Sequence, residues 1–305
     1  MSAPTIAITG ATGFVGQVLV RRAVTEGWQV RALARAPQSP IDGVVWVQGS
    51  LETPDALLEL AQGSDAIIHV AGVVNAADRA GFEAGNVTGT LAVIEAARKA
   101  GVERFIHVSS LAAREPQLSD YGWSKAKAET IVAASGLDWT MIRPTGVYGP
   151  GDTEMRDMFR MAQRGFVLLP PAGRVSLVEV SDLARLLLAV IPVSEARAQI
   201  YEADDGREGG WSHQEFGNAI GSAVGKSVST FHTPRALLQL AARLDRLVRG
   251  KGAKLTADRV SYLCHPDWTV DPAKRPPPEI WQPAIKTQEG LKATAAAYRA
   301  AGWLN

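Results

Sequence analysis

Residues 5–16 read TIAITGATGFVG, and an amphipathic run, VGQVLVRRAVTEG, follows up to Gly27. A short apolar run, a glycine-rich turn and a helical pattern in this order are typical of a strand that leads into a helix in an α/β protein. The glycines at 10, 13 and 16 differ by one residue from the common G-x-G-x-x-G spacing. The stretch predicts the first strand–loop–helix unit of a parallel sheet.

The glycines of this loop meet the needs of a dinucleotide site. Gly10 allows a tight turn, Gly13 lets the backbone approach a pyrophosphate, and Gly16 lets the helix pack closely on the strand. The helix N-terminus adds N–H groups and a positive dipole end. A turn without a ligand is the alternative, but the place at the first strand–helix junction favours dinucleotide binding. The expected contacts are Gly10, Thr12, Gly13, Phe14, Val15 and Gly16.

The first 150 residues continue this alternation. Largely apolar runs predict strands that are buried on both faces of a parallel sheet, and the amphipathic runs between them end at glycines, as helices do. Right-handed crossovers then give a doubly wound α/β sheet. The predicted strands are 5–9, 29–34, 44–48, 66–71, 104–110 and 139–144, and the predicted helices are 15–27, 54–63, 86–101 and 125–136.

Beyond Pro150 the alternation loosens. VSLVEV (175–180) and SDLARLLLAVI (181–191) indicate a return to the main sheet, with Ser181 as a helix N-cap, and QIYEA (199–203) could add a strand. Helices and proline-rich turns then predict a smaller, mostly helical lobe. We expect a dinucleotide-binding domain of residues 1–150 with 175–205, and a substrate lobe of residues 151–174 with 206–305.

Composition narrows the class of partner. The chain has 305 residues and a net charge of +1, which gives no reason to expect nucleic acid as a partner. Cys264 is the only cysteine, so an intrachain disulfide is impossible and a reducing cytoplasm is the expected setting. The N-terminus does not resemble a signal peptide, and no apolar run is long enough to predict a membrane span.

One late segment, PRALLQLAARLDRLVRG (234–250), carries an apolar stripe at helical spacing. The stripe predicts a face packed in the core, with arginines on the wet face, and docking on a membrane surface is the alternative. The stripe comprises Leu237, Leu240, Ala241, Leu244, Leu247 and Val248, and the arginines are Arg243, Arg246 and Arg249.

The end of the second predicted strand bears on the cofactor. An NAD site normally has an acid about twenty residues after the glycine loop, to bind the ribose 2′-hydroxyl. The chain has no acid between Glu26 and Asp42, but Arg35 stands at the strand end and Arg31 lies on the same strand face. A guanidinium suits a 2′-phosphate, so the two arginines favour NADP as the cofactor. The alternative interpretation is that both arginines are simply solvated at the edge of the sheet.

Residues 121–125, YGWSK, place Tyr121 and Lys125 on one face of a helix. An adjacent ammonium favours the phenolate, so we expect Lys125 to lower the pKa of Tyr121. The pair alone is a weak signal. His69 and His107 lie in apolar strand patterns and are expected to be satisfied core residues. Cys264 and His265 have no partners at ligand spacing, so no metal site is predicted.

Together these motifs resemble the extended short-chain dehydrogenase/reductase family, which has a Rossmann fold. The resemblance spans roughly residues 5–190 and rests on several motifs in order. They are TGATGFVG (9–16), HVAG (69–72), NVTGTLAVIEAARKAGVERFIHVSS (86–110), YGWSK (121–125) and RPTGVYGPGD (143–152).

The resemblance implies catalytic roles. Tyr121 would be the general acid that protonates a carbonyl oxygen, and Lys125 would hold the nicotinamide ribose. Ser110 would hydrogen-bond the substrate oxygen, with Ser109 as the alternative if the register differs by one. Asn86 would steady a helix and a water molecule, although a helix N-cap is equally consistent with its place.

The resemblance also implies cofactor contacts, with two departures from the family pattern. The family's Gly-Asp-Leu after the third strand is GSL here, so Ser50 offers adenine only a neutral contact. Nucleotide-sugar enzymes have an asparagine where this chain has Gly146, which we expect to open the pocket. The further expected contacts are Leu51, Ala71, Gly72, Val73, Pro144, Thr145 and Val147.

The departures favour the branch of dihydroflavonol reductases and 3β-hydroxysteroid dehydrogenases. We therefore expect an NADP-dependent ketone reductase or alcohol dehydrogenase for a mostly apolar small molecule. A nucleotide-sugar epimerase or dehydratase is the first alternative, and a non-catalytic NADP-binding sensor or assembly protein is the second. A homodimer could form through the helices of residues 86–100 and 121–135.

Overall fold

The apolar runs of the N-terminal half form adjacent strands in the computed structural model, which describes residues 3–253 and 255–305. The strands are β1 (Thr5–Thr9), β2 (Gln29–Ala34), β3 (Val44–Gln48), β4 (Ala66–His69), β5 (Arg104–Val108), β6 (Asp138–Pro144) and β11 (Gln199–Ala203). The pairs among β1–β6 are parallel, and the seven-stranded sheet has the order β11-β6-β5-β4-β1-β2-β3. The predicted doubly wound sheet is confirmed. Its order reverses between β1 and β4, the position at which such sheets bind ligands.

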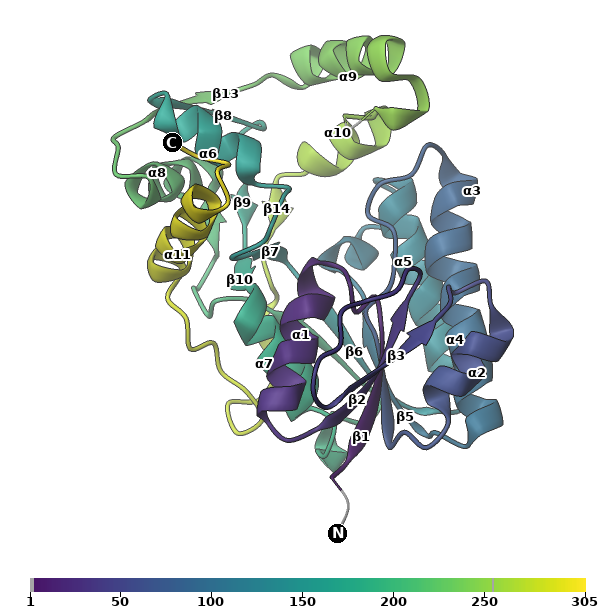
Figure 1. The fold of residues 1–305 in the computed structure, drawn as a ribbon. Helices are drawn as coiled ribbons and strands as arrows, with labels where there is room; N and C mark the ends of the chain where they lie inside the picture. Colours follow the sequence, from purple (N-terminus) through teal and green to yellow (C-terminus); the bar gives the residue numbers. More distant parts are fainter. Residues whose placement is uncertain (1–2, 254) are drawn as a thin grey trace. The chain divides into compact units, whose positions relative to one another are not determined.

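Helices cover both faces of this sheet (Figure 1). α1 (Phe14–Thr25) and α7 (Val180–Ala189) lie on one face, and α2 (Pro54–Ala61), α4 (Gly89–Ala100) and α5 (Asp120–Ala133) lie on the other. The central strands are apolar because neither face of the sheet meets water.

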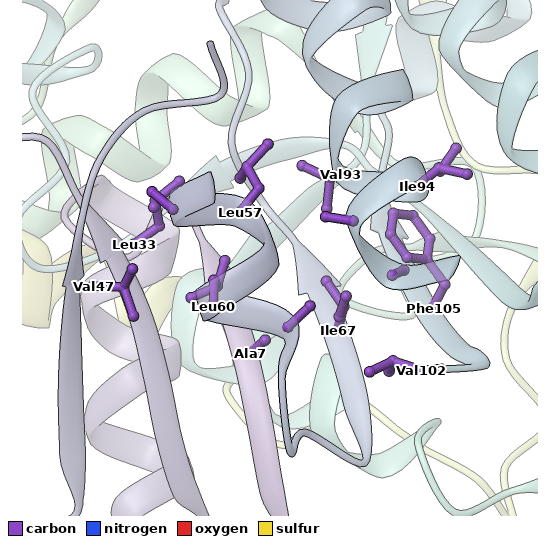
Figure 2. Close-up of a cluster of buried hydrophobic side chains, with 14 of the residues drawn as sticks. Ala7, Leu33, Val47, Leu57, Leu60, Ile67, Val93, Ile94, Val102 and Phe105 are labelled. Carbon is purple, nitrogen blue, oxygen red and sulfur yellow. The ribbon is translucent and has the colours of Figure 1, made fainter. Parts of the chain in front are cut away.

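One apolar cluster fills the space between the sheet and the helices α2 and α4 (Figure 2). Leu57 and Leu60 of α2 and Val93 of α4 pack with Ile67 and Phe105 of the strands, and none of these side chains is more than 1% exposed. Burying a side chain of this size stabilises the fold by about 1.5–3 kcal/mol. All five belong to predicted strands and helices, so the hydrophobic pattern accounts for this core.

Two arginines close the C-termini of helices. Arg31 donates from Nε and Nη2 to the last carbonyl oxygens of α2, at 3.1 and 2.6 Å. Arg104 is buried and donates to the carbonyl oxygens that follow α7, at 2.5 and 2.9 Å. Cations at a helix C-terminus satisfy free carbonyls and complement the helix dipole. Arg31 is therefore a helix cap, which corrects its expected place beside a cofactor phosphate.

The chain divides into two compact units that each draw on several segments. The first unit contains residues up to Arg143 with Leu183–Tyr201 and Pro276–Trp281, and the second contains Pro144–Asp182, Glu202–Arg275 and Gln282–Asn305. The second unit thus begins earlier than the expected substrate lobe and includes residues 175–182, while the first unit includes a late segment, 276–281.

The second unit combines helices with short strands. Its helices are α6 (Arg156–Gln163), α8 (His213–Ala223), α9 (Arg235–Arg249), α10 (Ala257–Leu263) and α11 (Thr287–Ala300). Its strands are β7 (Gly146–Tyr148), β8 (Phe166–Leu169), β9 (Arg174–Val175), β10 (Leu177–Glu179), β12 (Trp211–Ser212), β13 (Ser229–His232) and β14 (Asp267–Trp268). Tyr148, Phe159 and Tyr298 are fully buried at its core.

Two expectations for residues 175–181 are wrong. The predicted strand does not join the main sheet, because β10 pairs in parallel with β7 in a separate two-stranded sheet. Ser181 does not cap the next helix, which begins at Val180. The Glu179 carboxylate accepts from the N–H groups of Ser181 and Asp182 at 2.5 and 3.3 Å and so acts as the cap.

The stripe of α9 is not core, which corrects a further expectation. Leu237, Leu240 and Leu244 are each more than half exposed, and Leu247 and Val248 are more than 80% exposed. Helical spacing shows that residues share a face, but it does not show what covers that face. Among the described residues, no helix is long and apolar enough to cross a membrane.

Candidate active site

The glycine loop after β1 has the close backbone packing that its sequence predicts. Gly10 has a φ of +70°, and a Cβ there would lie 2.6 Å from the Ala71 nitrogen. A Cβ at Gly16 would collide with the Gly10 carbonyl oxygen, which accepts from the Gly13 N–H at 3.0 Å. Side chains at positions 10 and 16 would therefore push apart the loop, the segment after β4 and α1.

The N-terminus of α1 has the features of an anion site. Gly13 is the N-cap residue and provides no side-chain hydrogen bond, and the first turn has no acid. The first N–H groups of the helix are therefore left for an external acceptor, and the helix dipole favours a negative charge there. Thr12, Phe14 and Val15 flank the start of α1 in the sequence. Thr12 is exposed, and Phe14 and Val15 are half-buried. The loop fits a pyrophosphate.

Arg35 follows β2 and its side chain is exposed. None of the described residues forms an ion pair with it. A hollow of about 240 Å³ lies nearby at the carboxyl ends of β2 and β3, and it is lined by Ala34, Ala36, Pro37, Gln38, Trp46, Val47 and Gln48. Since Arg31 caps α2, Arg35 is the arginine of the predicted pair that can meet a ribose phosphate.

The predicted adenine contacts after β3 are engaged within the protein. The Ser50 hydroxyl accepts from the Glu52 N–H at 3.2 Å and lies 3.2 Å from the Thr53 hydroxyl, so it shapes the turn before α2. The Leu51 side chain packs closely on Gly89 of α4. The Ser50 hydroxyl already has partners within the protein, so it can offer a ligand only a neutral contact, as expected from the sequence.

Asn86 fixes the segment after β4, which contains Ala71, Gly72 and Val73. Its Oδ1 accepts from the Val73 N–H at 2.7 Å, and its Nδ2 donates to the Val73 carbonyl oxygen at 2.9 Å. Nδ2 also donates to the Ser124 hydroxyl at 2.9 Å, and Ser124 donates to the Tyr121 carbonyl oxygen at 2.7 Å. Asn86 therefore links this segment to the helix turn that carries Tyr121.

The backbone at Asn86 explains how its side chain reaches both partners. A short helix, α3 (Arg79–Phe82), continues into a π-helical stretch, Glu83–Thr88, and then into α4. π-Helical turns are rare and are frequent at functional sites. Asn86 lies inside this stretch, so the N-cap interpretation is wrong and the steadying role is supported.

A buried histidine joins the same network. His69 Nδ1 lies 2.7 Å from the Thr9 hydroxyl, and its Nε2 lies 3.0 Å from the Thr90 hydroxyl. Thr90 gives its proton to the Asn86 carbonyl oxygen at 2.6 Å, so His69 donates from Nε2 and accepts from Thr9 at Nδ1. Burial and the nearby Lys125 lower the pKa of His69 to about 3, which keeps the ring neutral. His69 is the satisfied core residue that we predict.

His107 differs from that prediction. It pairs with His69 in the sheet register and is buried, and neither of its ring nitrogens has a hydrogen-bond partner among the described residues. Burial lowers the pKa of His107 well below its usual value, so this ring is also neutral. It is a core residue, but an unsatisfied one.

The predicted catalytic residues of the first unit lie close together. Ser110 follows β5, and its side chain shares a hydrogen bond with that of Tyr121 near the start of α5. The Lys125 ammonium is buried and donates to the Val108 carbonyl oxygen at 2.8 Å. Ser110, Tyr121 and Lys125 therefore meet at the carboxyl end of β5, along the sheet edge that also carries the glycine loop.

The electrostatics of the pair differ from the expectation. Burial raises the pKa of Tyr121 above 10, and the Ser110 hydrogen bond only partly opposes this effect. Burial lowers the pKa of Lys125 to about 8, while the Glu129 carboxylate opposes that shift. The net shift of the Tyr121 pKa is thus opposite to the predicted lowering, and its causes are burial and Ser110 rather than Lys125. Tyr121 is a neutral phenol at pH 7 and can donate a proton.

Ser109 has a different partner, which makes it structural. Its hydroxyl donates to Glu129 Oε1 at 2.6 Å, and Arg143 binds both oxygens of the same carboxylate at 2.8 and 2.7 Å. Ser110 rather than Ser109 is therefore the serine beside Tyr121. Sequence reasoning missed Glu129 and Ser124, although Glu129 stands four residues after Lys125 on the same helix face.

The remaining predicted cofactor contacts belong to the second unit. The Thr145 hydroxyl donates to the Ala203 carbonyl oxygen at 3.1 Å, and Val147 lies in β7, which Pro144 and Thr145 precede. A Cβ at Gly146 would lie 3.0 Å from the Leu177 side chain. Leu177 therefore approaches this position closely, and the opening of the pocket at Gly146 stays a prediction. No cluster of potential metal ligands occurs among the described residues, and Cys264 lies outside any such cluster.

Comparisons with known proteins show which family the chain resembles. A family model described as NAD(P)H-binding matches residues 10–191. The ceramide reductase of Caulobacter vibrioides is 38% identical over 310 residues, which cover 98% of this chain and 96% of that protein. The 2-alkyl-3-oxoalkanoate reductase of Stenotrophomonas maltophilia is 30% identical over 335 residues, which cover 96% and 99%.

A solved structure shares the fold. The structure of MoeE5 in complex with UDP-glucose and NAD superposes with a TM-score of 0.72 at 20% identity, and the match covers 98% of this chain and 99% of that one. The family model, the two reductases and the Rossmann sheet agree with one another. The chain therefore belongs to the extended short-chain dehydrogenase/reductase family, as an NAD(P)-dependent oxidoreductase.

Proposed function

We propose that the protein is an NADPH-dependent reductase of a ketone that is carried on a long apolar chain. The hydrogen bond between the Ser110 and Tyr121 side chains carries this proposal. The Tyr121 phenol and a second hydroxyl at the carboxyl end of β5 support a role in proton donation. A carbonyl oxygen that takes the place of this hydrogen bond can accept from both groups.

The residues on the sheet edge suit a nicotinamide dinucleotide, which supplies the hydride when bound. The Gly10–Gly16 loop and the free N–H groups of α1 would hold its pyrophosphate. Lys125 would hold the nicotinamide ribose. The segment around Gly72 would lie under the adenosine ribose. Arg35 is the residue that would prefer the 2′-phosphate of NADP, because it is exposed and always charged.

Tyr121 then acts as a proton donor. Its raised pKa keeps the phenol protonated at neutral pH, which suits reduction of a ketone better than oxidation of an alcohol. Once the proton has moved to the carbonyl oxygen, a phenolate remains. The Lys125 ammonium, one helical turn away, stabilises that negative charge. Asn86 and Ser124 hold the helix turn in place through the Tyr121 carbonyl.

Two relatives and one position of the chain support this class of substrate. Two relatives that align along nearly the whole chain are named as reductases of ceramide and of a 2-alkyl-3-oxoalkanoate, both of which carry alkyl chains. A Cβ at Gly146 would lie 3.0 Å from the Leu177 side chain, so the asparagine typical of nucleotide-sugar enzymes would require that side chain to shift. The alternative of an epimerase or dehydratase is disfavoured on that ground.

The direct test is oxidation of NADPH by the purified protein with the ketone derivative of a ceramide in detergent micelles. NADH and a nucleotide sugar serve as parallel assays. Tyr121→Phe should lower turnover at least about 100-fold, the lower bound for losing a general acid, and leave NADPH affinity within tenfold. NADPH binding without consumption by any ketone would contradict the proposal and favour a sensor.

The cofactor preference has its own test. Arg35→Ala should weaken NADPH binding by about tenfold or more, since the phosphate loses a charge-assisted hydrogen bond of about 1.5–3 kcal/mol. NADH binding should not change. Arg31→Ala is the matched control, because Arg31 caps α2 and should affect stability but not the ratio of the two affinities. Equal losses for both cofactors with Arg35→Ala would contradict its role.

A further inference from the structure

The helix α9 exposes a continuous apolar face. Its stripe of Leu237, Leu240, Leu244, Leu247 and Val248 is 55%, 52%, 54%, 81% and 83% exposed. Residues at this spacing form one band along the helix. Scattered surface leucines are ordinary, but five large apolar side chains on one band mark an interaction surface.

The exposure does not come from an undocked helix. α9 packs on α10 through its other side, where Ala242 is only 4% exposed and Leu238 and Asp245 are half-buried. The Asp245 carboxylate accepts from the Leu255 N–H at 2.9 Å, which ties the returning chain to the helix. The α9–α10 packing therefore turns the apolar stripe away from α10.

The polar side of α9 is strongly basic. The helix carries four arginines, Arg235, Arg243, Arg246 and Arg249, and a single acid, Asp245, whereas the whole chain has a net charge of only +1. Arg249 is paired with Asp245 at 3.2 Å. An apolar face with arginines on the polar face is the pattern of helices that lie in the interface of a bilayer. Long arginine side chains can reach headgroups while their stems cover apolar surface.

We propose that α9 docks the protein on the surface of a bilayer that contains anionic lipids. The apolar stripe enters the acyl boundary and the arginines bind the headgroups. A second copy of the chain suits this face less well, because a symmetric contact would bring two arginine-rich helices together. The proposal extends the proposed function, since a ketone on a long apolar chain resides in a bilayer and the docked enzyme would meet it there.

The test is flotation of the full-length protein with vesicles of phosphatidylcholine alone or mixed with phosphatidylglycerol. The wild type should bind the mixed vesicles and be released by high salt. Leu244→Ser with Leu247→Ser should lower binding at least tenfold. Arg243→Gln with Arg246→Gln should remove most of the preference for phosphatidylglycerol. All four residues are exposed, so the variants should fold.

The matched control replaces two exposed apolar residues elsewhere. Ile41→Ser with Val45→Ser should leave vesicle binding unchanged, since these residues lie in the first unit and are 40% and 53% exposed. Tyr121→Phe should float like the wild type although it is inactive, which separates docking from the proposed chemistry. The docking proposal would be overturned if active wild-type protein does not bind the mixed vesicles. It would also be overturned if the leucine variants float as well as the wild type. A wild-type dimer that the leucine variants split into monomers, without vesicle binding, would also overturn it.

Discussion

His107→Leu should stabilise the protein, whereas His69→Leu on the neighbouring strand should destabilise it. The two rings are register partners on β5 and β4 and stack with centroids 5.4 Å apart. Both are buried, so water does not compensate for a missing hydrogen bond. They differ in their partners, because His69 uses both ring nitrogens and His107 uses neither among the described residues.

The magnitude follows from this difference. A neutral imidazole has one donor and one acceptor, and an unpaired buried polar group costs about 1–3 kcal/mol. Leucine at 107 removes both polar groups. It also loses the ring contact, which is worth about 0.5–1.5 kcal/mol, and its different shape costs up to about 1.5 kcal/mol in packing. The net gain in the free energy of unfolding is on the order of 1–3 kcal/mol. Leucine at 69 leaves the Thr9 hydroxyl without its acceptor and costs about 1–3 kcal/mol.

A lower pH should enlarge the gain in the free energy of unfolding that His107→Leu produces. The folded-state pKa values of both histidines lie far below 6.5, with His69 at about 3, whereas the unfolded chain takes up protons near pH 6.5. Each histidine therefore removes about 1.4 kcal/mol of stability per pH unit as the pH falls below 6.5. His107→Leu eliminates one of these two losses. Its advantage over the wild type should grow by about 2 kcal/mol between pH 7 and pH 5.

Urea unfolding followed by tryptophan fluorescence, at pH 7 and pH 5, measures both effects. The expected result is a higher midpoint for His107→Leu and a lower one for His69→Leu, with the same dependence on urea. A lower midpoint for His107→Leu at pH 7 would refute the reasoning, because it would show that the His107 ring is satisfied in the folded state.

Three further predictions concern the site and its frame. Ketone reduction should have a flat kcat/KM from pH 6 to 7, while alcohol oxidation rises with pH, because burial raises the pKa of Tyr121 and Lys125 keeps its proton below a pKa of about 8; a fall in reduction between pH 6 and pH 7 would contradict this. Ser124→Ala should lower kcat about tenfold without changing NADPH affinity, as Ser124 bridges Asn86 to Tyr121, and Thr130→Ala on the exposed side of α5 is the control. Arg104→Met should lower the free energy of unfolding by about 2–4 kcal/mol, measured by urea, since buried carbonyls at the end of α7 lose their donor.

The sheet was predictable because its strands have a single possible environment. A parallel strand covered on both faces must be apolar, so runs such as 66–69 and 104–108 indicate strands without knowledge of the rest. The glycines at 10 and 16 were predictable for a similar reason, since close backbone approach excludes every other side chain. Both features depend on local sequence alone.

The failures concern partners that lie far away in the sequence. Arg31 lies on the same strand face as Arg35, but the C-terminus of α2 attracts it instead. The stripe of α9 has the spacing of a core helix, yet the spacing does not reveal that the described residues leave it exposed. The pKa of Tyr121 depends on how deeply the fold buries the phenol, and a four-residue interval cannot report that depth.

The place of β11 in the sheet affects how the protein is made. β6 ends at Pro144, but its outer neighbour does not begin until Gln199. The ribosome adds roughly 5–20 residues per second, so residues 145–198 take several seconds to emerge. During that interval β6 has a free edge with unpaired N–H and C=O groups, where another nascent chain could add a strand. A slow stretch of translation within this segment would lengthen the exposure, and binding of a chaperone there would protect the chain.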